Sequence, residues 1–339
     1  MTETVEMSLD VYAIGNALVD REFSVTDEFL QQCSLQKGTM HLVDVQAQNQ
    51  LFEWLMQHNT VSTEASGGSA GNTAYAVAAL GGTAFYACRV GHDAMGEFYL
   101  ADMQRAGVQT SPRAQSLGQT GTCLVLVTAD AERTMHTHLG ISAELSVEQV
   151  DPTPLAQAQY LYIEGYLASS PSARQAVQQL RQLARTHGCK LALSLSDPAM
   201  VQYCREGLED LIGDGVDVLF CNAQEALLFA QTHELAVAVD LLLLHAPLAV
   251  VTLGSEGALI ARADGLRQPV PPQQVLEVLD TNGAGDGFAG GFLYGLSQHF
   301  TLNDCGHLGT AVATAIIQQY GPRLPRARYA QILQQMIQP

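Results

Sequence analysis

The sequence predicts an α/β protein with a mostly parallel sheet and a second, smaller β-sheet near its ligand site. Short apolar strands recur along the chain at 160–163, 191–195, 217–221 and 249–253, and a helix at 171–186 separates the first two. Strand, helix and strand at this spacing form a parallel sheet whose two faces are covered. Segments 18–25 and 39–45 are also β-like, but many of their side chains are polar, which favours a small sheet that covers the site.

Size and composition narrow the class of protein. The chain has 339 residues, of which 47% are hydrophobic, so it can bury a large core. The acidic opening 1–10 lacks the features of a signal peptide, and no uninterrupted apolar run could span a membrane, so we expect a cytoplasmic protein. Seven scattered cysteines favour reduced core thiols. The net charge of −18 argues against affinity for nucleic acid or for anionic membranes.

The first strand, 11–15, ends at a pair of polar candidates. Asn16 follows it directly and Asp20 lies four residues later. Ligands of open α/β sheets bind at the carboxyl ends of the strands, and a carboxylate can accept two adjacent sugar hydroxyls. Asp20 as a surface residue that begins a loop is the alternative.

A glycine pair precedes a helix of small residues at 66–82. Gly67 and Gly68 permit close backbone approach, and Asn72 offers both a donor and an acceptor to a substrate hydroxyl. The alternative is a close helix–sheet contact that needs no side chains.

Strands at 120–128 and 133–139 form a hairpin, which we expect to be the second part of the small sheet. Arg133 could meet a phosphate in bidentate fashion, although surface arginines are common in hairpins. His136 and His138 alternate onto one strand face, but no third ligand is near, which disfavours a metal site.

Two further segments follow predicted strands. Asn222 and Glu225 open a helix, where they match a capping box of Asn at the N-cap and Glu at the third position. Magnesium needs few protein carboxylates, so Glu225 could also serve an ion through water. The segment 250–257, VVTLGSEG, predicts a strand followed by a glycine turn.

The stretch 275–291, VLEVLDTNGAGDGFAGG, is the most informative. It predicts a strand that reaches Asp280, a turn at 281–285, and a helix from Asp286 onward. Unpaired amides and the helix dipole make such a turn an anion site, and Asp286 could cap the helix or accept a substrate proton. Two mechanisms are open: phosphoryl transfer, or dinucleotide binding by Gly285, Gly287 and Gly290 as GxGxxG. The late position in the chain argues against the dinucleotide.

These motifs together resemble the ribokinase-like PfkB family of sugar and nucleoside kinases. The resemblance rests on GN-x-x-x-D at 15–20, GG-x-x-x-N at 67–72, VGxDxxG at 90–96, N-x-x-E at 222–225, VTxGxxG at 251–257 and DTNGAGD at 280–286. It covers residues 16 to about 321, with the motifs in the family's order. DTNGAGD and CGHLGTAVATA look most like adenosine kinases, whereas Gly287 stands where the family usually has Ala.

The resemblance implies a fold and a set of roles. The fold is one three-layer α/β/α domain over 1–339, with lid strands inserted at about 16–45 and 110–140. Asp286 is the implied base, the amides of Gly283, Ala284 and Gly285 the implied anion site, and Glu225 the residue that positions Mg²⁺, through water. The implied acceptor site contains Asn16, Asp20, Gly67, Gly68, Asn72 and Arg133. The implied ATP site contains Asn222, Thr252, Gly254, Gly257, Thr281, Asn282 and His307.

The function implied is transfer of phosphate from ATP to a primary hydroxyl of a nucleoside, with adenosine converted to AMP. A ribokinase, fructokinase or 2-keto-3-deoxygluconate kinase is the first alternative. A dinucleotide-dependent oxidoreductase and a non-catalytic nucleoside sensor are alternatives from other classes. We expect only small-molecule partners and a monomer or homodimer.

Overall fold

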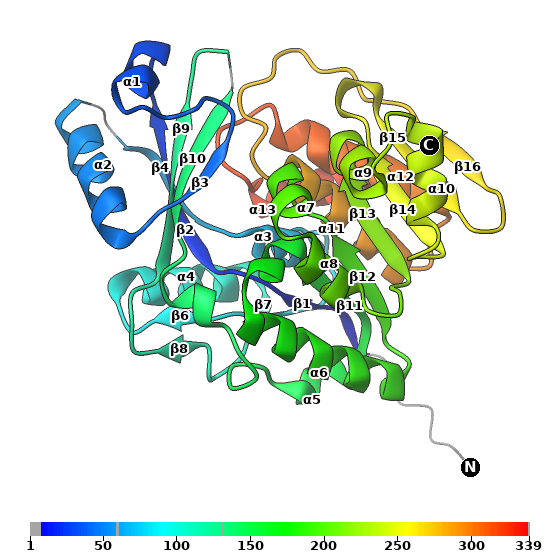
Figure 1. Ribbon diagram of the computed structural model, residues 1–339. Coiled ribbons are helices and arrows are strands. Elements are labelled where there is room, and N and C mark those ends of the chain that lie inside the picture. The colour runs from blue at the N-terminus through cyan, green and yellow to red at the C-terminus, as the bar shows by residue number, and fades with distance from the viewer. Residues whose placement is uncertain (1–7, 59–60, 131, 338–339) are drawn as a thin grey trace.

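A nine-stranded sheet forms the centre of the computed structural model, which describes residues 8–58, 61–130 and 132–337 (Figure 1). In spatial order the strands are β16 (Arg267–Val270), β15 (Ala258–Arg262), β14 (Leu248–Thr252), β13 (Val218–Asn222), β12 (Lys190–Ser194), β11 (Ala158–Glu164), β1 (Leu9–Ile14), β5 (Ala84–Ala87) and β7 (Val108–Thr110). Neighbours from β14 to β7 are parallel, and β15 and β16 join antiparallel at one edge. The predicted parallel sheet is confirmed.

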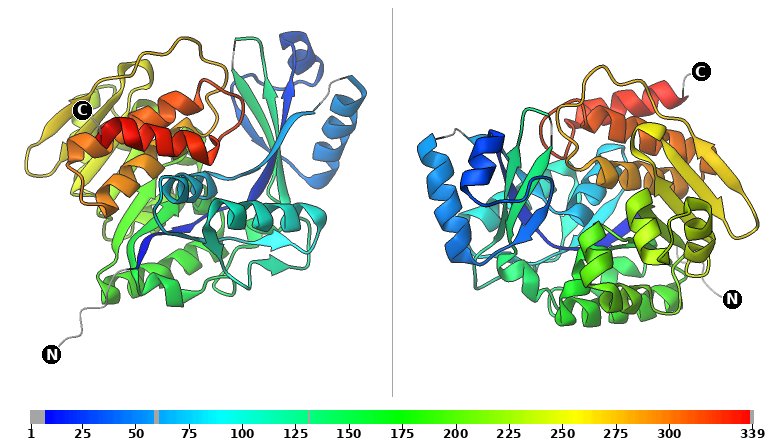
Figure 2. Two further views of the ribbon diagram at one scale, coloured as in Figure 1. Left: turned by 180° about the vertical axis from the view of Figure 1, so that it is seen from behind. Right: turned by 45° about the horizontal axis from the view of Figure 1, so that its top comes forward.

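Helices cover both faces of this sheet (Figure 2). One face carries α3 (Ser69–Ala79), α4 (Ala94–Ala106), α11 (Ala284–Ser297), α12 (Leu302–Ile316) and α13 (Arg326–Ile337). The other carries α5 (Pro152–Leu155), α6 (Pro171–His187), α7 (Pro198–Tyr203), α8 (Arg205–Ile212), α9 (Ala223–Ala230) and α10 (Leu235–Leu242). Because successive strand residues point to opposite faces, Val11 and Ala13 of β1 join one core and Tyr12 and Ile14 join the other.

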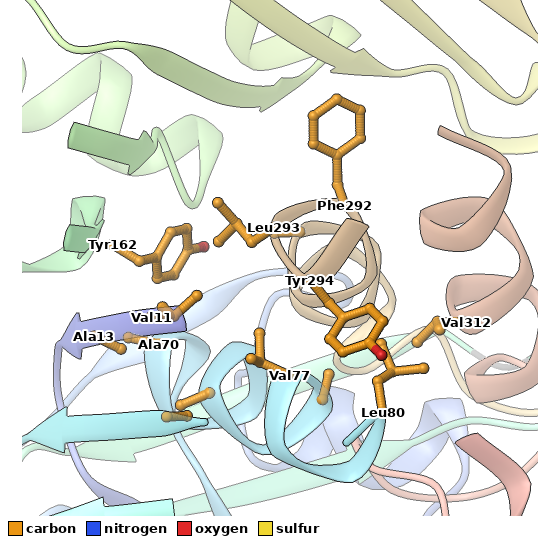
Figure 3. Packing of buried hydrophobic residues seen from close by; sticks show 14 of the residues in the cluster. Val11, Ala13, Ala70, Val77, Leu80, Tyr162, Phe292, Leu293, Tyr294 and Val312 are labelled. Carbon is orange, nitrogen blue, oxygen red and sulfur yellow. The ribbon is translucent and has the colours of Figure 1, made fainter. Parts of the chain in front are cut away.

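The first of these cores surrounds α11 and α3. Figure 3 shows side chains of α11, among them Leu293, beside Val77 of α3 and above Val11 of the sheet. This close packing fixes α11, whose N-terminal end carries Asp286, against the sheet.

A second sheet of five strands stands at one side of the large one and forms the lid (Figure 1). Its order is β3 (Met40–Leu42), β10 (Arg133–His138), β9 (Gly121–Val127), β2 (Leu18–Ser24) and β4 (Val61–Gly67). Strand β4 lies outside the two segments from which we expected lid strands. A separate two-stranded sheet pairs β6 (Val90–Gly91) with β8 (Gln115–Ser116).

Two helices cover the outer face of the lid. They are α1 (Asp27–Gln32) and α2 (Val45–His58), and they share a small apolar cluster with β2 and β9. Trp54 of α2 is 39% exposed, and its ring lies 5.8 Å from that of Phe29. The strand expected at 39–45 is shorter than predicted: β3 ends at Leu42, and helix α2 begins at Val45.

The expected strand at 275–279 is absent, since the described chain is irregular from β16 to α11. Leu276 of this run is 93% exposed, and the Leu279 amide donates to the Ile317 carbonyl at 2.8 Å rather than to a strand. Helix α11 begins at Ala284, two residues before the predicted start. Short 3₁₀ turns are η1 (Gly140–Glu144), η2 (Gly165–Ser169) and η3 (Gly254–Glu256). Among the described residues, no helix combines the length and apolar character needed to cross a bilayer.

Candidate active site

A cavity of about 370 Å³ lies between the lid and the carboxyl ends of the parallel strands. Most of the predicted site residues line it, although they come from segments far apart in the sequence. They are Asn16, Asp20, Gly68, Asn72, Arg133, Asn222, Glu225, Thr252, Thr281, Asn282, Gly283, Gly285 and Asp286. The fold therefore brings the two candidate subsites together in one cleft.

Five predicted residues do not line this cavity: Gly67, Ala284, Gly254, Gly257 and His307. Gly67 accepts a hydrogen bond from Tyr99 through its carbonyl, at 2.9 Å. Gly257 has a φ of +90°, and a Cβ there would lie 2.1 Å from the carbonyl oxygen of Val270, so this glycine serves the β14–β15 turn. Gly254 faces open space, and His307 is half-buried on α12.

Asp286 is the third residue of α11, and Gly283, in a left-handed conformation, is the N-cap instead. The Asp286 carboxylate accepts a hydrogen bond from Ser69 Oγ at 2.6 Å and another from Asn72 Nδ2 at 2.8 Å. Burial raises the pKa of Asp286, whereas these two hydrogen bonds and the nearby guanidinium groups lower it. The carboxylate does not cap the helix; α3 holds it at the cleft.

The turn before α11 is held by the buried Asp280 and by the segment that follows α12. Asp280 is fully buried and accepts hydrogen bonds from the amides of Asn282, at 2.9 Å, and Gly321, at 3.0 Å. A Cβ at Gly283 would lie 2.4 Å from the carbonyl oxygen of Pro322. By contrast, a Cβ at Gly285 would meet no atom within 4 Å. Space is therefore open beside the N-terminus of α11, where an anion can approach, although the Ala284 amide already donates to the Thr281 carbonyl at 3.3 Å.

The lid contributes two charged side chains to this turn. Arg133 donates hydrogen bonds to Thr281 Oγ1, at 3.1 Å, and Asn282 Oδ1, at 3.0 Å, and forms an ion pair with Asp280. Burial raises the pKa of Asp20 to about 7, against the opposing effects of Arg323 and of a hydrogen bond with Asn282. The lid thus contacts the turn directly.

Glu164, at the end of β11, organises the base of the cleft and was not among the predicted site residues. Its Oε1 accepts hydrogen bonds from the backbone and side-chain nitrogens of Asn16, and its Oε2 accepts one from the Ala70 amide. Burial raises the pKa of Glu164 to about 7, although these donors favour its charged form. Because Asn16 also accepts from Ser142, little of its bonding capacity is left for a ligand.

Sequence reasoning missed Ser69 and Arg323. Ser69 lies inside the glycine-rich stretch 66–82, so its proximity to Asn72 was readable. Arg323 lies between α12 and α13, in a segment without a recognisable motif, and no local signal indicated that it reaches Asn72.

The capping box at Asn222 and Glu225 is present. Asn222 Oδ1 accepts from the Glu225 amide at 2.8 Å, and Glu225 Oε2 accepts from the Asn222 amide at 3.0 Å. Burial raises the pKa of Glu225 to about 7.

The same two residues can be tested as part of a metal site. Within the described residues, no cluster of three or more His, Cys, Asp or Glu side chains could hold a metal. Glu225 lines the cleft, and each carboxylate oxygen keeps acceptor capacity, which fits a magnesium ion bound through water. This donor set does not fit a metal enclosed by protein ligands.

Gly287 and Gly290, which suggested a dinucleotide fingerprint, are packing residues. A Cβ at Gly287 would lie 2.2 Å from Ile316 Cδ1, and one at Gly290 would lie 2.6 Å from the Ala76 Cβ. No strand precedes their turn, so the geometry does not favour the dinucleotide alternative.

Comparison with known proteins agrees with this geometry. The sequence profile of the pfkB family of carbohydrate kinases matches residues 38–327. Adenosine kinase of Saccharomyces cerevisiae is 30% identical over 338 residues, which cover 94% of this chain and 98% of the yeast protein. The structure of adenosine kinase from Sinorhizobium meliloti superposes with a TM-score of 0.89 at 38% identity, covering 97% of this chain and 99% of that one. A probable sugar kinase from Rhizobium etli superposes with a TM-score of 0.90, also at 38% identity, covering 97% of this chain and 98% of that one. The chain therefore belongs to the pfkB family of carbohydrate kinases, the phosphotransferases that act on an alcohol group.

Proposed function

We propose that this kinase transfers the terminal phosphoryl group of ATP to the primary hydroxyl of a nucleoside, and that adenosine, which becomes AMP, is its substrate. The observation that carries the proposal is the Asp286 carboxylate, held by Ser69 and Asn72 beside the open first turn of α11. A base beside the N-terminus of a helix is an arrangement that suits phosphoryl transfer to a hydroxyl.

In this mechanism Asp286 accepts the proton of the acceptor hydroxyl as the hydroxyl oxygen attacks the terminal phosphorus of ATP. The bond between that phosphorus and ADP breaks, and ADP leaves. The amides of Gly283, Ala284 and Gly285 stabilise the negative charge on the transferred group. Arg133 reaches the same turn from the lid and adds a positive charge there. Magnesium, held through water by Glu225, would neutralise charge on the ATP phosphates. Thr252 and Asn222 also line the cleft and belong to the ATP side of the proposed site.

The acceptor side of the cleft favours a nucleoside over a free sugar. Apolar side chains of the lid line the cavity: Leu18, Met40, Leu42, Met135 and Leu139. A purine ring can bury apolar area against such a surface, whereas a sugar offers hydroxyls to it. Asp20 also lines the cavity, and its carboxylate can accept hydrogen bonds from the two ribose hydroxyls.

The yeast and Sinorhizobium relatives named above are adenosine kinases, which supports the same substrate. The Rhizobium protein is described as a probable sugar kinase, and this makes a sugar the alternative acceptor. We further propose that the enzyme works in the cytoplasm, where ATP and nucleosides are available.

The test is ADP release from MgATP with adenosine, inosine, ribose, fructose and 2-keto-3-deoxygluconate as acceptors. We expect strong stimulation by adenosine. Stimulation by a sugar alone would overturn the nucleoside proposal and keep the mechanism. No stimulation by any acceptor, together with binding of NAD(H), would overturn both the nucleoside substrate and the phosphoryl-transfer mechanism.

A further inference from the structure

A buried arginine, Arg323, contacts Asn72, one of the two residues that hold the proposed base. Arg323 is in the segment between α12 and α13, and only 6% of its side chain is exposed. Its guanidinium lies 4.9 Å from the centre of the Tyr75 ring. A buried charge is costly unless it is paired, so the partners of this group are informative.

Two of those partners come from different helices. Nε of Arg323 donates to Asn72 Oδ1 of α3 at 2.8 Å, and Nη1 donates to Asp102 Oδ2 of α4 at 3.2 Å. The same Asp102 oxygen also accepts from Ser66 Oγ. The planar guanidinium is therefore held by its bonds to Asn72 and Asp102 and by its contact with the Tyr75 ring, and these fix its position.

The bond to Asn72 determines which way the amide of that residue is turned. An amide has an oxygen that accepts and a nitrogen that donates, and an arginine can only donate. Arg323 therefore requires the oxygen of Asn72 on its own side. The nitrogen must then face the opposite side, where it donates to Asp286 Oδ2 at 2.8 Å. With the amide reversed, its oxygen would face the Asp286 carboxylate and its nitrogen the guanidinium, which are two repulsive contacts.

We propose that Arg323 is a positioning residue for phosphoryl transfer, which locks the Asn72 amide so that its nitrogen holds the Asp286 carboxylate. The inference rests on the proposed function, since it assigns Arg323 a part in the reaction of that site. Arg323 does not line the cavity, and it acts through Asn72.

The positive charge of Arg323 adds to this effect. Burial raises the pKa of Asp286, and Arg323 acts with Ser69, Asn72 and Arg133 to lower it. Two carboxylates, Asp20 and Glu164, also interact with Asp286 by charge. Loss of Arg323 removes one of the opposing cations and frees the Asn72 amide. Both changes favour the protonated acid, so the pKa of Asp286 should rise.

The experiment compares Arg323→Met with the wild-type enzyme across pH. The measured quantity is kcat/KM for ATP with the acceptor at saturation. Asp20 then already binds the acceptor, so its own titration does not affect the profile. A base is active when deprotonated, and a higher pKa therefore moves the acid limb of the profile to higher pH. We expect a shift of about one pH unit and a loss of about 10- to 100-fold near neutral pH, with a smaller change in the KM of the acceptor.

Arg105→Met is the matched control. Arg105 bonds to the other oxygen of Asp102, but its side chain is 68% exposed and it does not contact Asn72. This variant removes an arginine from the same carboxylate and should keep the wild-type profile. If Arg323 only ties α3 to α4, its loss would lower the thermal midpoint and leave the acid limb in place, and that result would overturn the inference.

Asn72→Ala and Arg323→Lys keep the test decisive if Arg323→Met does not fold, and the double variant adds a further check where Arg323→Met does fold. Asn72→Ala should show the same upward shift of the acid limb, and Arg323→Met in the Asn72→Ala background should cost no more than about threefold further. Arg323→Lys keeps the charge without the fixed fork, and we expect an intermediate loss. Additive losses, or a wild-type profile in Asn72→Ala and Arg323→Lys, would contradict the inference. A wild-type enzyme that phosphorylates no acceptor would instead overturn the proposed function.

Discussion

The two walls of the cleft are built in different ways. On one wall, α11 is packed so closely on its neighbours that its glycines from Gly287 onward have no room for a side chain. A Cβ at Gly290 would lie 2.9 Å from the Thr73 carbonyl oxygen of α3, and one at Gly291 would lie 3.1 Å from the backbone of Gly309 in α12. On the other wall, the lid is a separate sheet with its own small core, and it reaches the turn through the side chains of Asp20 and Arg133.

This difference separates two tasks. The chemistry depends on backbone that is packed in place, because the base and the anion turn must be positioned accurately before a substrate arrives. In the proposed function, recognition of the acceptor depends on side chains of the lid, a separate sheet whose residues could be replaced without disturbing α11. Substitutions on the two walls should therefore have different effects. Changes in and around α11 should alter turnover or stability, and changes in the lid should alter the affinity for the acceptor.

The largest effect is expected from Asp286→Asn. The amide keeps the shape and can still bond to Ser69, but it cannot take the proton of the acceptor. We expect kcat to fall by about 10³-fold, while ATP binding and the thermal midpoint remain close to wild type. Turnover near the wild-type rate in this variant would remove Asp286 as the base.

Asp20→Ala should act on the acceptor. Losing a charged hydrogen-bond acceptor costs about 1.5–3 kcal/mol, so the KM for the acceptor should rise by roughly 10- to 100-fold with a smaller change in kcat. Asp27→Ala is the control, because Asp27 is an exposed lid carboxylate paired with Lys37. Equal acceptor KM values in the two variants would show that Asp20 does not bind the acceptor.

The packing of α11 can be tested with two glycines. Gly290→Ala places a methyl group against Ala76 and should lower the free energy of unfolding by about 1–3 kcal/mol, measured by urea titration. Gly285→Ala meets no atom and should leave that free energy unchanged or raised. Its methyl group would instead obstruct the anion, and activity should fall. The same loss of stability in both variants would show that close packing is not what distinguishes the two positions.

Glu225→Gln should have the smallest effect. The variant keeps one acceptor for the capping box but loses the charge that would favour magnesium. We expect the magnesium concentration for half-maximal activity to rise by less than about tenfold. An unchanged magnesium titration would leave Glu225 with the capping role alone.

The sequence was most informative where one local pattern determines one local structure. The parallel strands, the α9 capping box and the glycine turn at 281–285 were readable because each depends on neighbouring residues. The run at 275–279 was misleading because its apolar residues do not pair with a strand: Leu276 stays exposed, and the Leu279 amide donates to the Ile317 carbonyl after α12 at 2.8 Å.

The remaining parts of the site depend on contacts between distant segments. Asn72 was expected to offer both of its polar atoms to a substrate, yet one bonds to Asp286 and the other to Arg323, 214 and 251 residues away. Strand β4 was missed for a related reason, since its place in the lid is set by pairing with β2 rather than by a pattern of its own. Such partners become visible only when the chain is folded.

The position of Trp54 gives the lid an optical label of its own. It is the single tryptophan of the sequence and lies on α2, which covers the outer face of the lid. Indole emission is sensitive to solvent and to adjacent rings, and Trp54 is partly exposed beside Phe29. Fluorescence excited at wavelengths where indole absorbs and the eleven tyrosines do not therefore reports on the lid, so a change in the lid on ligand binding can be timed separately from the chemical step.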